Sequence, residues 1–502
     1  MMGRRKIRVL FHVFGVAAVA CWLVMIGLLV KKVHFKEQPD GMATTVGAAT
    51  IESANREWKE IYLNNKKVGY AINLIRPFKE GYYIQEEIFL KLNLMGLGSD
   101  IYSLTQSQVN KDFLLKNFFF RMTSGVVRYS ISGKVEGNAL ILETGQGKEQ
   151  RTQTIPLSKS PMIGAGMSHF FKSRKLRVGE IFRLPLFDPS TMGQKEVVVR
   201  VVRREPLEVH RITYDAFRLE ADMWGKSVTF WLDEHGETLK EEGLMGLTAI
   251  RSSAARASRD IERDGGADLY EMTAIKIDKV LENPERLTYL ELKVDGVDPE
   301  SLKPEFRDGE RQTFHNGVLK IEKESPPVKA SFQLHKDVYS DEIKTFLEPE
   351  FNIESDDEKI IRRARQIIGS DTNPISATGK LLGWVYQNLD KRPVVSVPSA
   401  LEVLKTKVGD CNEHATLLTA LLRASGIPAR LCIGLVYTRE KFFYHAWTEA
   451  YVGEWISLDA TLNQMPADVT HIKLLEGNLD KQVEVVGLIG NLRLEVLDYR
   501  YD

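Results

Sequence analysis

One stretch of sequence, Val408-Gly409-Asp410-Cys411-Asn412-Glu413-His414-Ala415-Thr416-Leu417-Leu418, decides what the last third of this chain forms. Asp410 is a good N-cap, and Glu413 three residues later completes a capping box, so a helix is predicted to begin at Cys411. The Ala- and Leu-rich continuation runs to Ser425, where a following glycine and proline stop it. A thiol in the first turn of a helix faces the positive end of the helix dipole, which favours the thiolate.

Two further residues complete a candidate constellation downstream of Cys411. His445 lies in a strand-like segment, Tyr444-His445-Ala446-Trp447, and Asp459 ends the next one, Trp455-Ile456-Ser457-Leu458-Asp459. Cys, His and Asp in this order are typical of a nucleophile, a base and a residue that orients the base. With an imidazolium beside the helix start, the pKa of Cys411 is expected below the ordinary thiol value of about 8.5.

The hairpin between His445 and Asp459 is constrained by strand parity. Both side chains must face the same side of the sheet, and successive side chains of a strand alternate between faces. A plain two-residue turn would place Asp459 on the wrong face. A three-residue loop at 452–454, which pairs Tyr451 with Trp455, brings Asp459 diagonal to His445 and within side-chain reach. The sequence therefore predicts that loop, or a two-residue turn with a one-residue bulge.

Four ordered blocks resemble the transglutaminase-like superfamily between about 355 and 475. They are Gly409-Asp410-Cys411-Asn412-Glu413-His414-Ala415, Leu421-Leu422-Arg423-Ala424-Ser425-Gly426-Ile427-Pro428-Ala429-Arg430, His445-Ala446-Trp447-Thr448-Glu449 and Trp455-Ile456-Ser457-Leu458-Asp459-Ala460-Thr461. The resemblance implies a papain-like fold and a catalytic triad of Cys411, His445 and Asp459. The family includes transferases, peptide hydrolases and inactive members, so the resemblance does not decide the reaction.

Other residues near these motifs could share the chemistry or only pack. His414 lies about one turn after Cys411 and could compete as the base, although a histidine on a facing strand is favoured by geometry. Trp447 could shield the site or belong to the core. Trp384 is a weak candidate for stabilising an oxyanion, for which the backbone N–H of Cys411 is the better donor. Cys432 lies in an apolar strand and is expected to be core.

Composition sets broad limits on the protein. The chain has 502 residues, which suggests two or three domains besides any anchor, and it is 43% hydrophobic. Its 68 Lys and Arg balance 68 Asp and Glu, which gives no support to nucleic-acid binding. Three cysteines cannot form a disulfide framework, and the two in the body have no metal-ligand spacing. Neither a metal nor a cofactor is expected, because Cys-His chemistry needs none.

Strand and helix signals change along the chain, so the predicted fold class is multidomain α+β. A β-rich front precedes a back in which helices and strands mix, and this order is typical of that class. The predicted parts are a transmembrane helix at 9–30, a β-rich extracytoplasmic domain at 55–250, a second β-rich domain at 268–350, the transglutaminase-like domain at 351–480 and a C-terminal β extension at 481–502.

The apolar run at 9–30 predicts a membrane anchor. As a helix it spans roughly 33 Å, enough for a bilayer core. Basic residues flank both of its ends, with a slight excess before it, so the body is expected outside the cytoplasm, held at the inner membrane by a single pass. A cleaved signal peptide is the alternative, because Ala18-Val19-Ala20 resembles a cleavage site and Cys21 follows it as in a lipoprotein.

The chemistry of a thiolate attacking a carbonyl predicts a thioester intermediate. Water then gives hydrolysis of an amide or peptide bond, whereas an amine gives transamidation; bulk water favours hydrolysis. The expected partner at the site is a protein or peptide substrate, and the β-rich region has an unknown partner. A non-catalytic scaffold protein of the envelope, with an idle triad, is the alternative of a different class.

Overall fold

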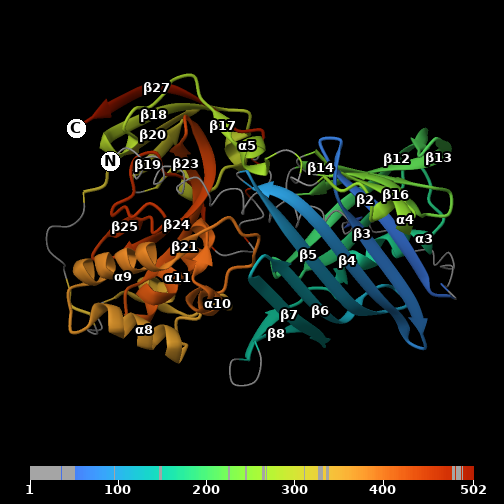
Figure 1. The fold of residues 1–502 in the computed structure, drawn as a ribbon, viewed down its shortest axis with the longest axis horizontal. Coiled ribbons are helices and arrows are strands. Elements are labelled where there is room, and N and C mark those ends of the chain that lie inside the picture. The colour runs from blue at the N-terminus through green and yellow to red at the C-terminus, as the bar shows by residue number, and fades with distance from the viewer. Residues whose placement is uncertain are drawn as a thin grey trace. The chain divides into compact units, whose positions relative to one another are not determined.

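A computed structural model describes most of the chain as two compact units. The described residues are 35–36 and 51–502, apart from 52, 95, 146–149, 224–225, 244–245, 263–265, 267, 310, 326–331, 335–338, 478–480, 482–484, 486–487 and 489. The first unit comprises the described residues up to 272, and the second unit comprises those from 273 to 502 (Figure 1).

The first unit is built on one large antiparallel sheet in which neighbours in sequence are nearly always neighbours in the sheet. Its order runs from β1 through β11–β16 to β2–β9, and β10 joins β11 in parallel. The strands are β1 (Phe35–Lys36), β2 (Asn55–Leu63), β3 (Lys66–Phe78), β4 (Gly81–Leu94), β5 (Leu97–Asn110), β6 (Leu115–Ser124), β7 (Val127–Glu136), β8 (Ala139–Thr144), β9 (Arg151–Pro156), β10 (Met162–Ile163), β11 (Ile181–Asp188), β12 (Gly193–Val209), β13 (Ile212–Met223), β14 (Lys226–Leu232), β15 (Thr238–Glu242) and β16 (Leu247–Ser252).

Strict alternation of buried and partly exposed residues along β4 explains why these strands form a sheet with one packed face. Short helices complete the unit: η2 (Gly164–Gly166), α3 (Met167–Lys172), α4 (Ala254–Ala257) and α5 (Leu269–Thr273), which ends at the unit boundary. Phe170 and Phe171 of α3 both pack edge-on against Phe182 of β11. The sheet's packed face therefore closes on α3.

The second unit contains three smaller sheets. A five-stranded sheet has the order β17-β24-β23-β26 with β25 added beside β24, a four-stranded sheet has the order β19-β20-β18-β27, and β21 pairs with β22. The strands are β17 (Ile275–Lys276), β18 (Leu287–Asp295), β19 (Gln312–His315), β20 (Val318–Glu322), β21 (Asp390–Lys391), β22 (Val408–Gly409), β23 (Ala429–Thr438), β24 (Lys441–Tyr451), β25 (Trp455–Leu458), β26 (Ile472–Glu476) and β27 (Arg493–Tyr501).

The second unit also contains several helices, of which the longer ones pack around α11. The helices are η4 (Pro284–Arg286), η5 (Pro299–Ser301), α6 (Pro304–Arg307), α7 (Asp341–Lys344), η6 (Thr345–Leu347), α8 (Glu358–Ile368), α9 (Pro374–Asn388), α10 (Ala400–Thr406) and α11 (Cys411–Ala424). α8, α9 and α10 pack on α11 from one side and β24 packs on it from another (Figure 1). Every residue of α11 from Cys411 to Arg423 is consequently buried.

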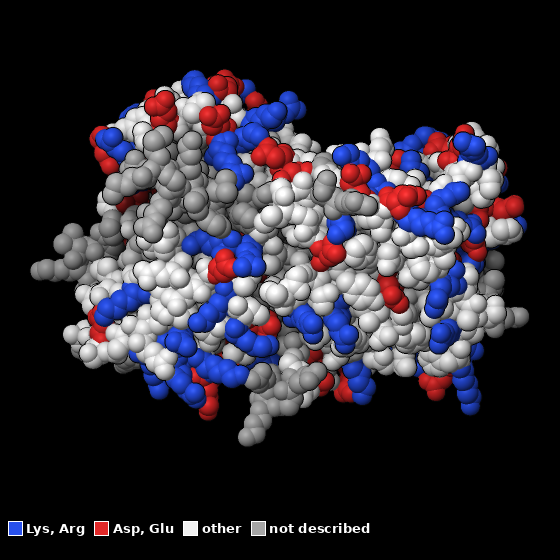
Figure 2. Space-filling view, in the orientation of Figure 1, with Lys and Arg blue, Asp and Glu red and all other residues white. Residues whose placement is uncertain are grey.

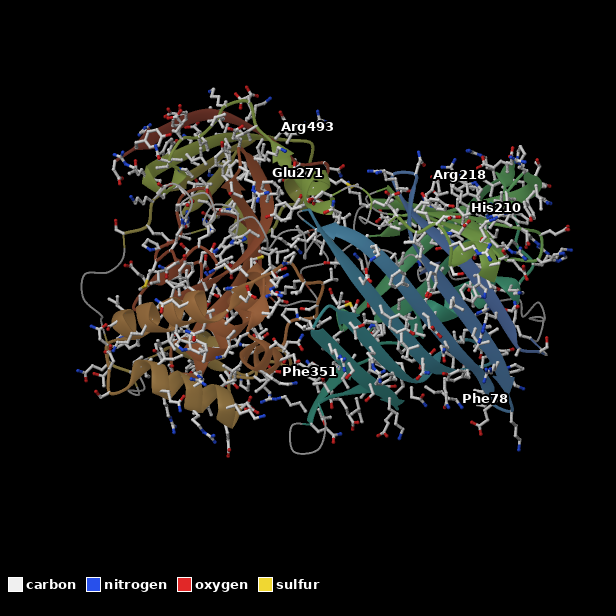
Figure 3. All side chains as sticks on the ribbon, viewed as in Figure 1. Phe78, His210, Arg218, Glu271, Phe351 and Arg493 are labelled. Atoms are coloured by element: carbon white, nitrogen blue, oxygen red, sulfur yellow. The ribbon has the colours of Figure 1, made fainter. Side chains whose placement is uncertain are left out.

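Charged side chains of both signs are interspersed over the face shown in Figure 2, as expected for a chain with balanced charge. Arg218 of the first unit, labelled in Figure 3, pairs with Glu220 two residues along the same strand. Such exposed pairs contribute little to stability. The structural interest of the charges therefore lies in the buried groups of the second unit.

The predicted α+β class is wrong for the chain as a whole. The structure is mostly β, with 50% strand and 20% helix. The longer helices, α8 to α11, are confined to residues 358–424, while strands dominate on both sides of that segment. Helical periodicity in that one segment therefore does not set the class of the chain, because long antiparallel strands make up most of the rest.

The predicted membrane anchor is also corrected. Among the described residues, no helix is long and apolar enough to cross a bilayer. The longest of them, α9, has 15 residues and spans about 22 Å, less than the ~30 Å of a hydrocarbon core. The predicted span at 9–30 lies outside the described residues. Single-pass anchoring at the inner membrane is thus unsupported.

Candidate active site

The helix that carries the candidate nucleophile begins as predicted. Asp410 accepts a hydrogen bond from the Asn412 amide at 3.1 Å, and the Glu413 carboxylate accepts one from the Asp410 amide at 2.9 Å. Both halves of the capping box are present, so the predicted start of α11 at Cys411 is confirmed. Gly409 precedes the cap because a Cβ there would lie 2.2 Å from the Glu413 Cβ.

The thiol of Cys411 lies at a gap in the edge of β24. Along one edge β24 pairs with β23 over its whole length. Along the other edge it pairs with β17 at 441–442 and with β25 from Thr448 onward. Between these two stretches the Ala446 amide donates a hydrogen bond to Cys411 Sγ at 3.3 Å. The start of α11 is therefore held against the main chain next to His445.

His445 and Asp459 are joined directly. His445 Nε2 lies 2.6 Å from Asp459 Oδ2, and both side chains are buried. Because ionised Asp459 can only accept, Nε2 carries the proton. His445 Nδ1 has no hydrogen-bond partner among the described residues. Nδ1 is the ring nitrogen nearer the main chain. The amide of the next residue, Ala446, donates the hydrogen bond to Cys411 Sγ. Nδ1 is thus the atom available to take the thiol proton.

The register of the β24–β25 hairpin confirms the prediction made from parity. Tyr451 pairs with Trp455 across a three-residue loop, which the Val452 amide closes by donating to the Glu454 carbonyl at 2.9 Å. Gly453 in the loop has a φ of 119°, a conformation that favours glycine. This register places Asp459 on the face of the sheet that carries His445.

Residues 361–460 match the family model of the transglutaminase-like superfamily. They form a transglutaminase-like domain.

Solved structures were also compared. A candidate cysteine protease from Cytophaga hutchinsonii shares 20% identity, over 43% of this chain and 86% of its own, with a TM-score of 0.27. A β-barrel-like protein of a domain of unknown function from Brucella abortus shares 13% identity, over 39% of this chain and 95% of its own, with a TM-score of 0.31. A candidate protease from Parabacteroides distasonis shares 13% identity, over 78% of this chain and 64% of its own, with a TM-score of 0.20. The comparison with curated proteins found no match.

The expected lowering of the pKa of Cys411 is wrong in this structure. Burial raises the pKa of the thiol well above its ordinary value, and the neighbouring Asp410 carboxylate adds to the rise. The Ala446 amide opposes it by donating to the sulfur. Sequence reasoning counted the helix dipole but could not foresee that the thiol is withdrawn from water, which disfavours the charged form.

Asp459 of the transglutaminase-like domain is held as a carboxylate. Its Oδ1 accepts the amides of Thr461 at 2.6 Å and Leu462 at 3.0 Å, and its Oδ2 accepts from His445 and from a second histidine, His471, at 3.1 Å. Burial would raise the pKa of Asp459, but the hydrogen bonds and charges of the two histidines outweigh it and lower the pKa well below its usual range.

His471 is the site residue that sequence reasoning missed. Its Nδ1 lies 3.3 Å from Asp468 Oδ1 and from the Asp468 carbonyl oxygen. Burial opposes its charge, yet hydrogen bonds to Asp459 and Asp468 raise the pKa of His471 to about 9. Asp468 itself has a pKa of about 2, since its contacts with His471 and Thr470 outweigh burial. No motif spacing signals this histidine, because it reaches Asp459 only through the pairing of β26 with β23.

The alternative residues take other places. His414 donates from Nδ1 to the Asp410 carbonyl at 2.6 Å, and burial lowers its pKa to about 4, so it is neutral. Trp384 packs beneath Arg363, with 5.3 Å between the guanidinium and the ring. Cys432 is buried in β23, as expected. Trp447 shares the face of β24 with His445, with ring centroids 6.4 Å apart, and stands edge-on to His471 at 5.3 Å.

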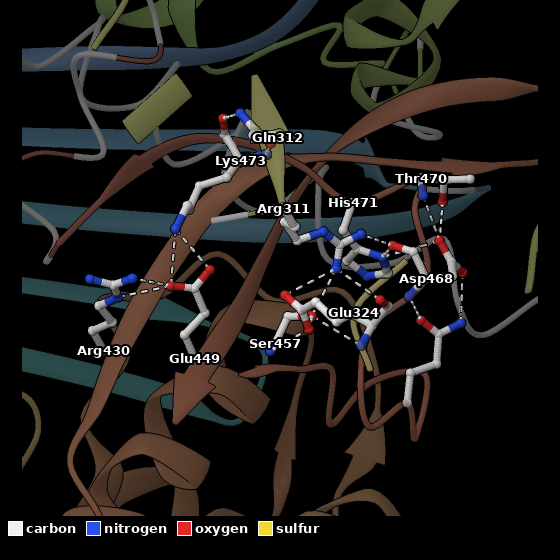
Figure 4. Close-up of polar contacts among 12 residues, drawn as sticks. Arg311, Gln312, Glu324, Arg430, Glu449, Ser457, Asp468, Thr470, His471 and Lys473 are labelled. Atoms are coloured by element: carbon white, nitrogen blue, oxygen red, sulfur yellow. Dashed lines mark hydrogen bonds and ion pairs between the residues drawn. The ribbon is translucent and has the colours of Figure 1, made fainter. Parts of the chain in front are cut away.

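Two buried polar networks support the sheet behind the site (Figure 4). In one, Glu449 of β24 accepts Lys473 at 2.8 Å and Arg430 at 2.7 Å. In the other, Arg311 beside β19 donates to Ser457 Oγ and to the Ala467 carbonyl, both at 2.8 Å, and to the Asp468 carbonyl. The four-stranded sheet thereby holds the loop that leads to His471.

The His445–Asp459–His471 group also has the composition of a metal site. Its ligand atoms all lie within 4.8 Å of one another. The two hydrogen bonds to Asp459 Oδ2 already account for these separations, so the grouping is not an independent sign of a metal. What the arrangement can do chemically is move a proton between a thiol and an imidazole whose far side is held by a carboxylate.

Proposed function

We propose that the transglutaminase-like domain hydrolyses amide or peptide bonds of a protein or peptide substrate. Cys411 would be the nucleophile, His445 the base and Asp459 the residue that orients the base. The observation that carries the proposal is the asymmetry of His445: Nε2 is fixed on Asp459, while Nδ1 is left for the proton of a thiol that hydrogen-bonds the next amide.

The first half of the reaction forms a thioester. His445 Nδ1 takes the proton as Cys411 Sγ attacks the carbonyl carbon. Because the pKa of the thiol is raised, proton transfer accompanies the attack rather than preceding it. The amide N–H of Cys411, in the first turn of α11, has no intrahelical acceptor and can donate to the developing oxyanion. The leaving amine takes the proton from His445, and an acyl group remains on the sulfur.

The second half restores the enzyme. Water attacks the thioester while His445 takes one of its protons, and the tetrahedral intermediate expels the sulfur. The proton on His445 returns to the thiolate and the carboxylic acid leaves. An amine in place of water would give acyl transfer by the same route, so the products of one incubation with and without an added primary amine separate the two outcomes.

Labelling with iodoacetamide tests the assignment. We expect alkylation of Cys411, located by mass spectrometry, and its loss in Cys411→Ala. The rate should fall about 10²- to 10⁴-fold in His445→Ala, the usual contribution of a general base. Cys432→Ala is the matched control, since its thiol is buried in β23 opposite Trp447 and is not hydrogen-bonded to the Ala446 amide as Cys411 is. Undiminished labelling of Cys411 in His445→Ala would rule out His445 as the base that activates Cys411. If the labelling confirms the assignment, a Cys411→Ser variant used as bait should retain the substrate and identify it.

A further inference from the structure

We propose that His471 is a positioning residue of this site that pairs with Asp459 as an imidazolium and thereby keeps Cys411 and His445 uncharged in the resting enzyme. The inference rests on the proposed function, because it assigns a role beside the same thiol and base. It adds a second histidine to the group that orients the base.

The hydrogen bonds of His471 show its charge. Nε2 faces Asp459 Oδ2 at 3.1 Å, and Nδ1 faces two oxygens of Asp468 at 3.3 Å. Asp459 has its other oxygen filled by two amide donors, and Asp468 Oδ1 accepts from the Thr470 amide and hydroxyl. Both carboxylates are therefore acceptors toward the ring. An imidazole with acceptors at both nitrogens must carry both protons, which makes it the cation.

His445 differs from His471 in this respect. Its Nε2 has the same acceptor, Asp459 Oδ2, but its Nδ1 has no partner among the described residues. One imidazole on Asp459 is thus held as a cation and the other is left with a free lone pair. The ring centroids of His445 and His471 are 5.6 Å apart, and the edge of Trp447 fixes the second ring. The asymmetry assigns the base role to His445 alone.

Charge balance gives the consequence. His471 is faced by Asp468 on its own loop, by Asp459 after β25 and by His445 on β24. Lys391 of β21 acts on Asp459 from across the site, and Arg311 binds the Asp468 carbonyl. A cation at His471 offsets the charge of Asp459. Protonation of His445 is then less favourable than it would be beside an uncompensated Asp459 carboxylate. The ion pair of a Cys411 thiolate with a His445 imidazolium is disfavoured for the same reason.

Two variants on different residues remove the cation. His471→Gln keeps an amide donor near the position of Nε2 and removes the charge. Asp468→Asn keeps the histidine but removes the carboxylate that holds its second proton. In both, Asp459 is left uncompensated and favours the imidazolium of His445. The inflection in the pH dependence of Cys411 alkylation should therefore move down by at least one pH unit. His315→Gln, at an exposed histidine of β19, should leave it unchanged.

The outcomes separate this inference from the proposed function. A merely structural role for His471 would lower thermal stability without moving the inflection, and an inflection that stays or rises in both variants overturns the inference. NMR of ¹⁵N-histidine supplies a readout independent of the thiol. In the wild type, the resonance lost in His471→Gln should titrate near pH 9; titration below pH 7 would also overturn the inference. If Cys411 is unreactive at every pH, the proposed function fails while the NMR titration still decides the charge of His471.

Discussion

Arg311 donates a hydrogen bond to the main-chain carbonyl of Asp468, and this contact fixes the loop that leads to His471. The guanidinium also binds Ser457 Oγ and the Ala467 carbonyl and lies 3.6 Å from Glu324. Arg311, which directly precedes β19 and lies well before residues 361–460, therefore contacts the main chain of Asp468, whose carboxylate faces His471.

Removing this guanidinium should loosen the site. Arg311→Met keeps the length of the side chain but leaves two buried carbonyls without their donor and Glu324 without its paired cation. We expect a loss of about 3–5 kcal/mol in the free energy of unfolding, the usual effect of breaking a buried charged contact. Urea titration measures it. Arg307→Met, at a half-exposed arginine, is the control and should change little. Equal stability of the two variants would contradict a supporting role for Arg311.

Replacing the orienting carboxylate should nearly abolish activity. In Asp459→Asn the amide group can present N–H to His445 Nε2, which favours the tautomer with its proton on Nδ1. That nitrogen then cannot accept the thiol proton. We expect amide hydrolysis and Cys411 alkylation to fall about 10²- to 10⁴-fold. The far-ultraviolet circular dichroism should be unchanged. Asp498→Asn on the exposed end of β27 is the matched control, and a similar loss there would point to a general effect.

His414 should be dispensable for proton transfer. Its Nδ1 is committed to the Asp410 carbonyl and its pKa is about 4. We expect His414→Asn, which can keep that hydrogen bond, to stay within about tenfold of wild-type alkylation, whereas losing the true base costs about 10²- to 10⁴-fold. If His414→Asn is as damaged as His445→Ala while still folded, the assignment of the base must be revised.

Glu449 should matter for stability rather than for catalysis. It is buried, and its contacts with Lys473 and Arg430 outweigh burial and lower its pKa. Glu449→Gln leaves Lys473 and Arg430 with Glu476 as the carboxylate that still pairs with both. We therefore expect a loss of about 1–3 kcal/mol. The double variant Glu449→Leu/Lys473→Met removes both charges and should recover much of that loss. Chemical denaturation checks both. A double variant no better than the single one would show that the charges are not coupled.

The stability of the domain should depend on pH through His471. Its pKa is raised from 6.5 to about 9 on folding. The stabilisation is therefore complete below about pH 6.5 and is lost as the pH rises to about 9, by up to about 3 kcal/mol. Asp459 acts in the opposite range, because a lowered pKa gives stability that is lost as the medium becomes strongly acidic. His471→Gln should flatten the alkaline side of the profile, and an unchanged slope there would contradict this.

Local sequence was enough to place two features of the candidate site. The capping box fixes the start of α11 at Cys411 because its donors and acceptors lie within four residues of one another. Strand parity fixes the loop that pairs Tyr451 with Trp455, because a one-residue slip would turn Asp459 away from His445. These are short-range constraints, and no distant part of the chain can relax them.

Only the tertiary structure decided the rest. The overall balance of strand and helix depends on how many long strands find partners, which periodicity in one segment does not reveal. His471 meets Asp459 because β26 pairs with β23 across the sheet, although no spacing in the sequence links the two. The state of the Cys411 thiol follows the same rule: the helix start favours the thiolate, but burial by surrounding elements raises its pKa. Desolvation and charge pairing act through space, so they are set by the folded arrangement rather than by neighbours along the chain.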